Sequence, residues 1–286
     1  MHRRFVVLTA SFLCFLLLLA NPLQAAAVSP VPQTTLPGFP CYRDLNTLYA
    51  DASALASAYP NLAALSDIGD SWVKVQTGGA EGYDLFVLRL TNSAIPGSKP
   101  ALILVSGTHA RDLAPVELNL RFAENLLAGY GSDPNLTWLL DLTEVHIILS
   151  ANPDGRAVVE GQIANGLADE FGANAHKKNT NSATCPDPAL AGADLDRNFP
   201  FQWQQGPTGC MNDYPGQAAA SEPETAALKA YLESVLGDYR SSGPDEPADP
   251  GARGLVVHVQ SFGNKVFYPY SYRSLPAPEE EALFTL

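Results

Sequence analysis

The segment Ala101–Asp112, with the sequence ALILVSGTHARD, decides the fold class of this 286-residue chain. Its first five residues form an apolar run without a polar interruption, which is typical of a β-strand that is covered on both faces. A glycine turn follows, in which His109 and Asp112 are three residues apart, and a helical segment starts near Pro115. In α/β proteins, ligands bind at the carboxyl ends of such strands. We therefore predict an α/β fold with a candidate metal site in this turn.

Three helices are predicted, the first two from apolar residues at helical spacing. They cover residues 42–59, 116–127 and 222–236. Ser221 is expected to cap the last helix, and Pro223 is tolerated in its first turn. Residues 152–155 (NPDG) predict a turn, and the polar stretch 161–209 predicts a long functional loop.

Strands are predicted from apolar or alternating runs on either side of residues 101–105. They cover residues 72–75, 83–91, 145–149 and 254–260, the first two as an antiparallel pair. A strand, a helix and a strand in succession over residues 101–149 imply a parallel crossover. We therefore expect an α/β fold with a mixed, mainly parallel central sheet flanked by helices.

The first 27 residues have the three parts of a secretory signal peptide. A basic start (HRR, residues 2–4) precedes an almost wholly apolar stretch over residues 5–20, and three alanines at 25–27 fit the cleavage site. An uncleaved membrane anchor is the alternative, but about 16 apolar residues are short for a membrane span. We expect residues 28–40 to form an extended lead-in with no folded propeptide. We also expect one domain over residues 41–286, no stable membrane anchor, and a secreted or periplasmic protein.

Export from the cytoplasm changes how the cysteines are interpreted. Once Cys14 leaves with the signal peptide, Cys41, Cys185 and Cys210 remain, an odd number in an oxidising compartment. Cys185 and Cys210 flank one loop region, and we predict a disulfide between them. Closing such a loop stabilises the fold by about 3–4 kcal/mol in the chain-entropy model. Cys41 then remains free or pairs with another chain.

The composition narrows the classes of partner. With 46% hydrophobic residues, the chain is long enough for one large core, and we expect a monomer. The formal net charge of −13 becomes −15 when Arg3 and Arg4 are removed with the signal peptide. A solvated acidic surface explains this charge and disfavours nucleic acid as a partner.

Five motifs follow one another in an order that resembles a known family. They are residues 107–112 (GTHARD), 152–155 (NPDG), 192–199 (GADLDRNF), 221–225 (SEPET) and 261–270 (SFGNKVFYPY). The order resembles that of secreted zinc carboxypeptidases of the carboxypeptidase A and T type, over about residues 41–270. The resemblance implies a mixed sheet of about eight strands with the site at the carboxyl ends of the central strands. It also implies a chain that lacks the C-terminal part of the family's fold.

The resemblance implies removal of C-terminal amino acids from peptides or proteins. One Zn²⁺ ion would polarise the scissile carbonyl and activate water. The family's first two ligands, a His and a Glu, fall on His109 and Asp112, although these two residues also fit a hydrogen-bonded loop pair. The third ligand, a His, falls on Gln260, and a neutral amide oxygen is a poor zinc ligand. His258, two residues earlier on the same strand face, is the alternative ligand, or else a histidine satisfied by its neighbours.

Other site residues of the family also have counterparts here, some of them with a different side chain. Arg111 matches an arginine that helps to bind substrate, although it also fits a loop arginine paired with a carboxylate. Lys177 replaces the arginine at the oxyanion position and keeps the charge without the bidentate fork. Alternatively, Lys177 belongs to a solvated charge run. Asp196 and Arg197 replace an Asn-Arg pair that grips the substrate's terminal carboxylate. Arg197 suits a bidentate clamp, whereas Asp196 repels a carboxylate unless the two form an ion pair.

The catalytic Glu that serves as general base in the family has no counterpart that we assign here. Glu279, Glu280 and Glu281 lie in a polar tail without the context of a strand. Our first hypothesis is a zinc metallocarboxypeptidase. The alternative is a catalytically impaired family member that binds peptides or acts as a scaffold. A third hypothesis, an amidohydrolase acting on small acylated amino acids, fits the peptidase-like surroundings of Arg197 less well.

Overall fold

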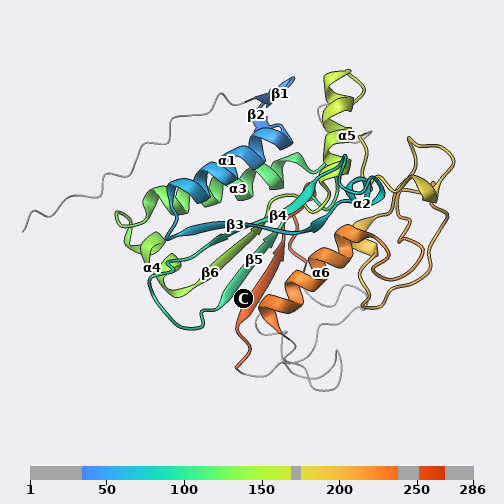
Figure 1. Ribbon diagram of the computed structural model, residues 1–286. Coiled ribbons are helices and arrows are strands. Elements are labelled where there is room, and N and C mark those ends of the chain that lie inside the picture. The colour runs from blue at the N-terminus through green and yellow to red at the C-terminus, as the bar shows by residue number, and fades with distance from the viewer. Residues whose placement is uncertain (1–33, 169–174, 238–250, 268–286) are drawn as a thin grey trace, which may run out of the picture.

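A five-stranded mixed sheet forms the centre of the molecule (Figure 1). The computed structural model describes residues 34–168, 175–237 and 251–267. The order of the strands is β3 (Ala63–Asp70), β4 (Asp84–Leu90), β6 (Glu144–Ile148), β5 (Ala101–Val105) and β7 (Gly254–His258). Strand β4 runs antiparallel to β3 and β6, whereas β5 runs parallel to β6 and β7. The α/β fold with a mixed sheet is confirmed, with two parallel and two antiparallel pairs in the described residues.

Helices cover both faces of this sheet (Figure 1). One face carries α1 (Leu45–Ala58), α3 (Leu113–Gly129) and α4 (Pro134–Leu142), and the other carries α6 (Pro223–Leu236). Apolar residues of α1 and α3 such as Leu48 and Leu120 are fully buried against the sheet. On the opposite face, Leu228 of α6 packs against Ile103 of β5. Strand β5 is thus covered on both sides, as its uninterrupted apolar sequence predicts.

Shorter elements surround the carboxyl ends of the parallel strands. They are β1 (Thr35–Leu36), β2 (Phe39–Arg43), α2 (Trp72–Gln76), α5 (Pro153–Ala164), η1 (Ser182–Thr184) and η2 (Leu195–Arg197). Strands β1 and β2 pair as a hairpin, so the part of the predicted extended lead-in that the structure describes is paired. The predicted signal peptide and residues 28–33 lie outside the described residues, as do Glu279, Glu280 and Glu281.

The predicted strand over residues 72–75 is wrong, because these residues form helix α2. Two buried carboxylates from distant elements satisfy the free N–H groups of its first turn. The N–H of Trp72 donates to Glu224 Oε1 at 2.7 Å, and that of Val73 donates to Asp154 Oδ2 at 2.8 Å. These long-range caps outweigh the strand preference of the valines. The antiparallel partners of β4 are instead β3 and β6.

Two boundaries near helices also differ from the prediction. The predicted turn over residues 152–155 is the start of α5, where the side chain of Asn152 accepts from the N–H of Gly155 and Pro153 occupies the first turn. Ser221 is not the N-cap of α6. Glu222 occupies that position, and Ser221 Oγ donates to Glu222 Oε1 at 2.9 Å instead. Ser221 therefore predicts where α6 begins, but it does not make the capping contact.

The cysteines confirm the predicted disulfide. Cys185 and Cys210 are bonded, with a Cα–Cα distance of 5.0 Å, and Cys41 is an exposed free cysteine. Within the described ranges, no helix is long and apolar enough to cross a membrane.

Candidate functional site

A sharp turn after β5 carries His109 to the carboxyl ends of β5 and β6. Gly107 has a φ of +68°, and a Cβ at this position would meet Val116 and Ser150, so the turn requires glycine. The backbone N–H of Ala110 donates to the carbonyl of Lys177 at 3.0 Å. This bond joins the His109 turn to the long loop, so residues about 70 positions apart in sequence form one site.

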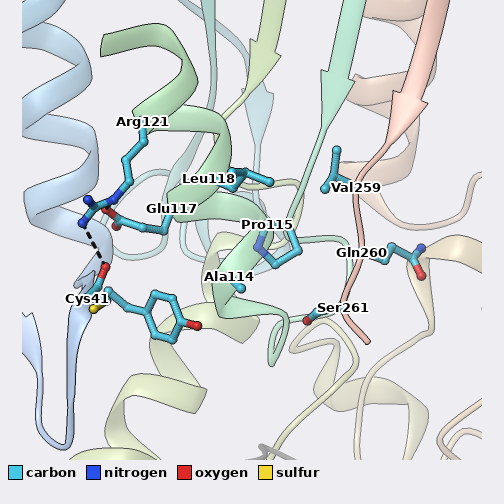
Figure 2. Close-up of a pocket in the computed structure, with 10 residues that line it drawn as sticks. Cys41, Ala114, Pro115, Glu117, Leu118, Arg121, Val259, Gln260 and Ser261 are labelled. Atoms are coloured by element: carbon cyan, nitrogen blue, oxygen red, sulfur yellow. Dashed lines mark hydrogen bonds and ion pairs between the residues drawn. The ribbon is translucent and has the colours of Figure 1, made fainter. Parts of the chain in front are cut away.

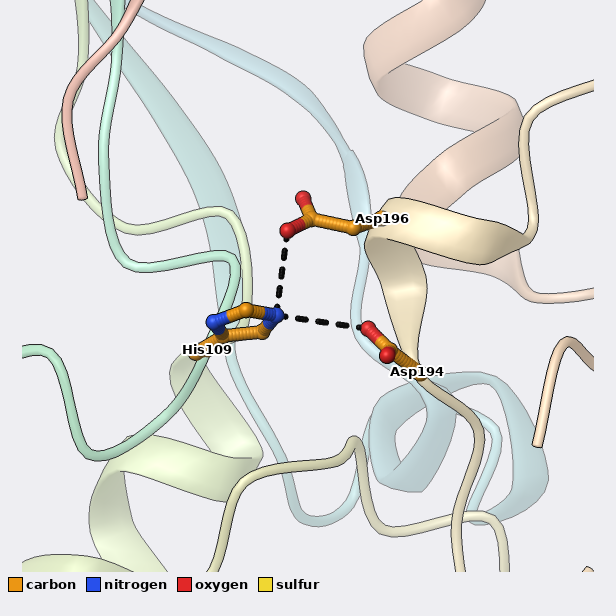
Figure 3. Close-up of side chains that lie close together, drawn as sticks. All are labelled: His109, Asp194 and Asp196. Atoms are coloured by element: carbon orange, nitrogen blue, oxygen red, sulfur yellow. Dashed lines mark ion pairs between the residues drawn. The ribbon is translucent and has the colours of Figure 1, made fainter. Parts of the chain in front are cut away.

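The imidazole of His109 lies between three carboxylates. Its Nε2 atom is 3.3 Å from Asp194 Oδ1 and 3.0 Å from Asp196 Oδ2, as Figure 3 shows. Its Nδ1 atom is 3.6 Å from Oδ2 of Asp112, on the other edge of the ring. His109 Nε2, Asp194 and Asp196 form a group whose ligand atoms all lie within 4.8 Å of one another. One histidine and carboxylates at this spacing can hold a divalent cation.

Asp194 is the most deeply buried of these carboxylates, with its side chain 1% exposed. Its Oδ2 atom is 2.5 Å from Lys177 Nζ and 3.3 Å from Arg197 Nε. Its Oδ1 atom is buried and faces His109 Nε2, which is also buried. A divalent cation could bind both atoms in place of the proton on Nε2. The residues present therefore fit a divalent metal ion.

The carboxylates also set the protonation of His109. Burial alone would lower the pKa of His109, but Asp112, Asp194 and Asp196 outweigh burial and raise the pKa to about 11. Burial disfavours the charged form of Asp194 as well, yet His109 and Lys177 hold the pKa of Asp194 below its usual range. Without a metal ion, both ring nitrogens of His109 carry a proton at neutral pH. A metal ion that binds His109 must displace one of these two protons.

Asp196 is held from the side of β7. Gln260 Nε2 donates to Asp196 Oδ2 at 2.6 Å, and His258 Nδ1 is 3.6 Å from Asp196 Oδ1. His258 Nε2 is also 2.6 Å from the hydroxyl of Thr108. Burial holds the pKa of His258 below its usual range in spite of Asp196. Asp196 does not pair with the neighbouring Arg197, which faces Asp194 instead.

The structure thus brings most of the sequence-predicted residues together. His109, Asp112, Asp196, Gln260 and His258 form one connected cluster, and Lys177 and Arg197 join it through Asp194. Arg111 lies on the same turn and is partly buried. Asp112 Oδ2 accepts from the N–H of Ser261 at 3.3 Å, which ties the turn to the chain after β7.

Sequence reasoning missed Asp194, although it belongs to the GADLDRNF motif. The signal was its spacing from Asp196, because two carboxylates two residues apart in a glycine-bounded loop can converge on one side chain. Here Asp194 precedes η2 and Asp196 lies within it, so the chain turns between them. That turn aims both carboxylates at His109.

Hydrogen bonds and a disulfide hold the loop that carries these carboxylates in place. Lys178 is buried, and its ammonium group donates to three backbone carbonyls, those of Leu190, Gly209 and Met211, at 2.5–2.9 Å. The Cys185–Cys210 disulfide closes the same loop. Asp194 and Asp196 are therefore held by a rigid segment despite its lack of long helices or strands.

A groove of about 340 Å³ lies beside the cluster (Figure 2). Strand β2, the first turns of α3 and the chain after β7 form its walls, and Gln260 is at its edge. The lining residues are Cys41, Tyr42, Ala114, Pro115, Glu117, Leu118, Arg121, Val259, Gln260 and Ser261. The groove is mostly apolar and open to solvent at the side of Leu118, which is exposed.

Comparison with known proteins gives consistent matches. A sequence profile for zinc carboxypeptidase matches residues 48–286. The protein named "Inactive metallocarboxypeptidase ECM14" of Saccharomyces cerevisiae is 27% identical over 84% of this chain. Carboxypeptidase A1 of Bos taurus is 23% identical over 90% of the chain. The chain spans about half the length of these relatives, 49% and 54% respectively.

Solved structures match the same fold. The crystal structure of thrombin activatable fibrinolysis inhibitor superposes with a TM-score of 0.67 and 23% identity, covering 85% of this chain and 53% of that one. At this identity the likeness concerns the fold. It agrees with the mixed sheet and with helices on both of its faces.

Proposed function

The chain belongs to the zinc carboxypeptidase family, and from this premise we propose that it binds one zinc ion at His109 and removes C-terminal amino acids from peptides. The observation that carries the proposal is the cluster of His109, Asp194 and Asp196, whose ligand atoms all lie within 4.8 Å of one another. Carboxylates and an imidazole are donors that zinc accepts. A bound zinc ion would polarise the scissile carbonyl and lower the pKa of water.

The chain's own residues supply recognition of the substrate. Arg197 is anchored through Nε to Asp194, while its side chain is 58% exposed, so it can present the guanidinium group to a peptide's terminal carboxylate. Asp196 is turned toward His109 and Gln260, which keeps its charge away from a carboxylate that docks on Arg197. Arg111, on the His109 turn, is the second arginine that we assign to substrate binding.

Lys177 is the residue that we assign to the oxyanion position. Its ammonium group is 2.5 Å from Asp194 Oδ2 and is therefore held beside the His109 turn. A positive charge there would stabilise the oxyanion that develops on the scissile carbonyl. Because Asp194 shares this charge, we expect Lys177 to contribute less than an unpaired cation would.

Hydrolysis of an N-blocked dipeptide tests the proposal. We expect product from the dipeptide with a free C-terminus and none from the same dipeptide with an amidated C-terminus. Removal of zinc by a chelator should abolish product formation, and added zinc should restore it. Arg197→Ala should lower kcat/KM about 10–100-fold, since it removes a charge-assisted hydrogen bond. Lys229→Ala, on the exposed face of α6, is the matched control. Absence of both bound zinc and product would overturn the proposal.

One observation favours a second function, the binding of peptide C-termini without hydrolysis. Gln260 occupies the position of the third ligand in the resemblance, and its side-chain N–H₂ is engaged with Asp196. A relative from yeast carries the name inactive metallocarboxypeptidase. In this case the peptide with a free C-terminus should bind, Arg197→Ala should weaken binding, and no product should form at any zinc concentration.

We also propose that the protein is exported through residues 1–27 and acts as a secreted or periplasmic monomer over residues 41–286. The Cys185–Cys210 disulfide supports an oxidising compartment. N-terminal sequencing of the mature protein and its mass in solution test this proposal. A mature protein that retains residues 1–27 would contradict it.

A further inference from the structure

We propose that Asn179 is a positioning residue for the candidate site. It joins residues 193–197 to the start of α6 and thereby holds Lys177 and Arg197 where they meet the substrate. The inference rests on the proposed function, since Lys177 and Arg197 are the residues assigned there to the oxyanion and to the terminal carboxylate. It extends that function to a residue that touches neither the substrate nor a metal ion.

Asn179 holds Ala193 with two hydrogen bonds. The backbone N–H of Asn179 donates to the carbonyl of Ala193 at 3.0 Å, and the side-chain Oδ1 of Asn179 accepts from the N–H of Ala193 at 2.7 Å. The two chain segments approach so closely that a Cβ at Gly192, which has a φ of +111°, would meet the carbonyl oxygen of Asn179. Because Asp194 follows Ala193 directly, Asn179 fixes the backbone from which the Asp194 carboxylate extends.

The Asp194 carboxylate in turn sets the positions of both cationic groups. Its Oδ2 atom is 2.5 Å from Lys177 Nζ and 3.3 Å from Arg197 Nε. Lys177 precedes Asn179 by two positions on one segment, and Arg197 lies in η2 on the other. A movement at Ala193 would therefore shift Asp194 and, with it, the two groups that are assigned to the substrate.

The other edge of the Asn179 side chain binds the start of α6. Its Nδ2 atom donates to Glu222 Oε2 at 2.8 Å and to Glu224 Oε2 at 3.1 Å. All three side chains are buried. Both carboxylates lie at the N-terminus of α6, where the helix dipole favours negative charge. Asn179 thus ties the loop to a helix that packs against the central sheet.

Asn198 holds the opposite end of the same segment. Its Oδ1 atom accepts from the backbone N–H of Glu222 at 3.1 Å. Residues 193–198 are therefore fixed to the start of α6 at both ends. Of the two asparagines, Asn179 lies beside Lys177 in the chain, so it connects both cationic groups to the helix.

The contacts at position 179 require an amide. An amide offers an acceptor, which the N–H of Ala193 uses, and donors, which Glu222 and Glu224 use. A carboxylate at this position would keep the acceptor but would face two buried carboxylates, which is unfavourable. The hydrogen bond to Glu224 can be reversed, because Glu224 Oε1 accepts from the N–H of Trp72 and only Oε2 faces Asn179.

Nuclear magnetic resonance of the ¹³C-lysine-labelled protein tests the inference without a substrate. The two Hε protons of a lysine give separate resonances when the side chain is held and merge when it moves freely. We expect separate resonances for Lys177 in the wild-type protein and merged ones in Asn179→Asp. Lys178 is the internal control, because its ammonium group binds three backbone carbonyls of the same loop and should stay immobile in both proteins. Unchanged Lys177 resonances, or merged resonances for both lysines, would overturn the inference.

Reversal of the hydrogen bond gives a second test, which also covers the case that Asn179→Asp does not fold. Glu224→Gln alone places two N–H₂ groups opposite each other, whereas in the double variant the new amide can donate to the new carboxylate. The assay is made at about pH 8, where Glu224 is ionised, since burial raises its pKa to about 7. Each single variant should lower kcat/KM for the blocked dipeptide at least about tenfold, mainly through kcat, because the oxyanion forms only in the transition state.

The double variant should be at least about threefold more active than either single variant, because the two sites are in contact. A double variant that is no more active than the single variants would overturn the inference.

Asn181→Asp is the matched control. Asn181 Nδ2 also donates to Glu222 Oε2, at 2.9 Å, but the side-chain oxygen of Asn181 accepts from the N–H of Ala183. The substitution therefore adds the same charge beside the same carboxylate without changing the bonds that hold Ala193. We expect kcat and KM to stay within about threefold of the wild-type values. An equal loss in Asn181→Asp and Asn179→Asp would overturn the inference.

Failure of the proposed function gives a different result. A wild-type protein that neither hydrolyses nor binds the peptide would overturn that function. The Lys177 and Lys178 resonances would still decide whether Asn179 positions Lys177.

Discussion

Removal of the Cys185–Cys210 disulfide should destabilise the whole fold, because it closes the loop that carries Asp194 and Asp196. The change is the double substitution Cys185→Ser and Cys210→Ser. The two cysteines are 25 positions apart. In the chain-entropy model, closing a loop of this length removes about 12 cal/mol/K from the unfolded chain, or about 3.5 kcal/mol at 25 °C. We therefore expect the free energy of unfolding to fall by about 3–4 kcal/mol.

The contacts of this loop explain why the loss should appear in global unfolding. Lys178 holds the carbonyls on both sides of the loop, those of Leu190 and of Gly209 and Met211, whether or not the disulfide is present. The folded loop therefore keeps its conformation, and the change acts mainly on the unfolded chain. Zinc affinity of the folded variant should accordingly stay within about threefold of the wild-type value.

Urea unfolding, followed by far-UV circular dichroism, measures the loss. Cys41→Ser is the matched control, because Cys41 is exposed and outside the disulfide, and it should change the free energy of unfolding by less than about 0.5 kcal/mol. A double variant that loses less than about 1 kcal/mol would refute the entropic argument. A lost zinc affinity with unchanged global stability would show that the disulfide acts on the folded site instead.

Three further predictions concern buried polar groups. Lys178→Met should lower the free energy of unfolding by about 3–5 kcal/mol in thermal or urea unfolding, because it leaves three buried carbonyls without donors, and a loss under 1 kcal/mol would contradict this. Asp154→Ala should cost about 2–3 kcal/mol, since it removes the acceptor for Val73 N–H and Ser71 Oγ, while Asp67→Ala, at an exposed position of β3, should cost little in the same assay. Burial raises the pKa of Glu224 from 4.5 to about 7, so the folded protein holds this proton more tightly than the unfolded chain does. The tighter binding of this proton stabilises the folded protein fully below about pH 4.5. This contribution to the free energy of unfolding, on the order of 3 kcal/mol, is lost as the pH rises through about 7. Glu224→Gln should flatten this part of the plot of unfolding free energy against pH.

Local sequence patterns predicted the elements whose structure depends on their own residues. The apolar run Ala101–Val105 is β5 with the predicted bounds, and residues 145–149 differ from β6 by one residue at each end. The same patterns missed α4, although Asp133 and Pro134 mark its start with an N-cap and a first-turn proline. Periodicity over nine residues is a weaker signal than these caps.

Long-range contacts account for the errors. Helix α2 contains two valines, and its helical state depends on Asp154 and Glu224, which are 81 and 152 residues away from their N–H partners. No local pattern contains that information. The candidate site also depends on both local and long-range contacts. The His109 turn was predicted from its own sequence, whereas Asp194 joins it only through the fold of the loop.

The most direct test of the His109 centre is calorimetric titration of Zn²⁺ into the metal-free protein, wild type and His109→Ala. The wild-type protein should bind one equivalent of zinc and release a proton, since Asp112, Asp194 and Asp196 outweigh the effect of burial and give metal-free His109 a pKa of about 11. His109→Ala should bind at least 100-fold more weakly, because the remaining donors are carboxylates in ion pairs. One equivalent of zinc bound to His109→Ala with wild-type affinity would contradict a metal centre built on this histidine.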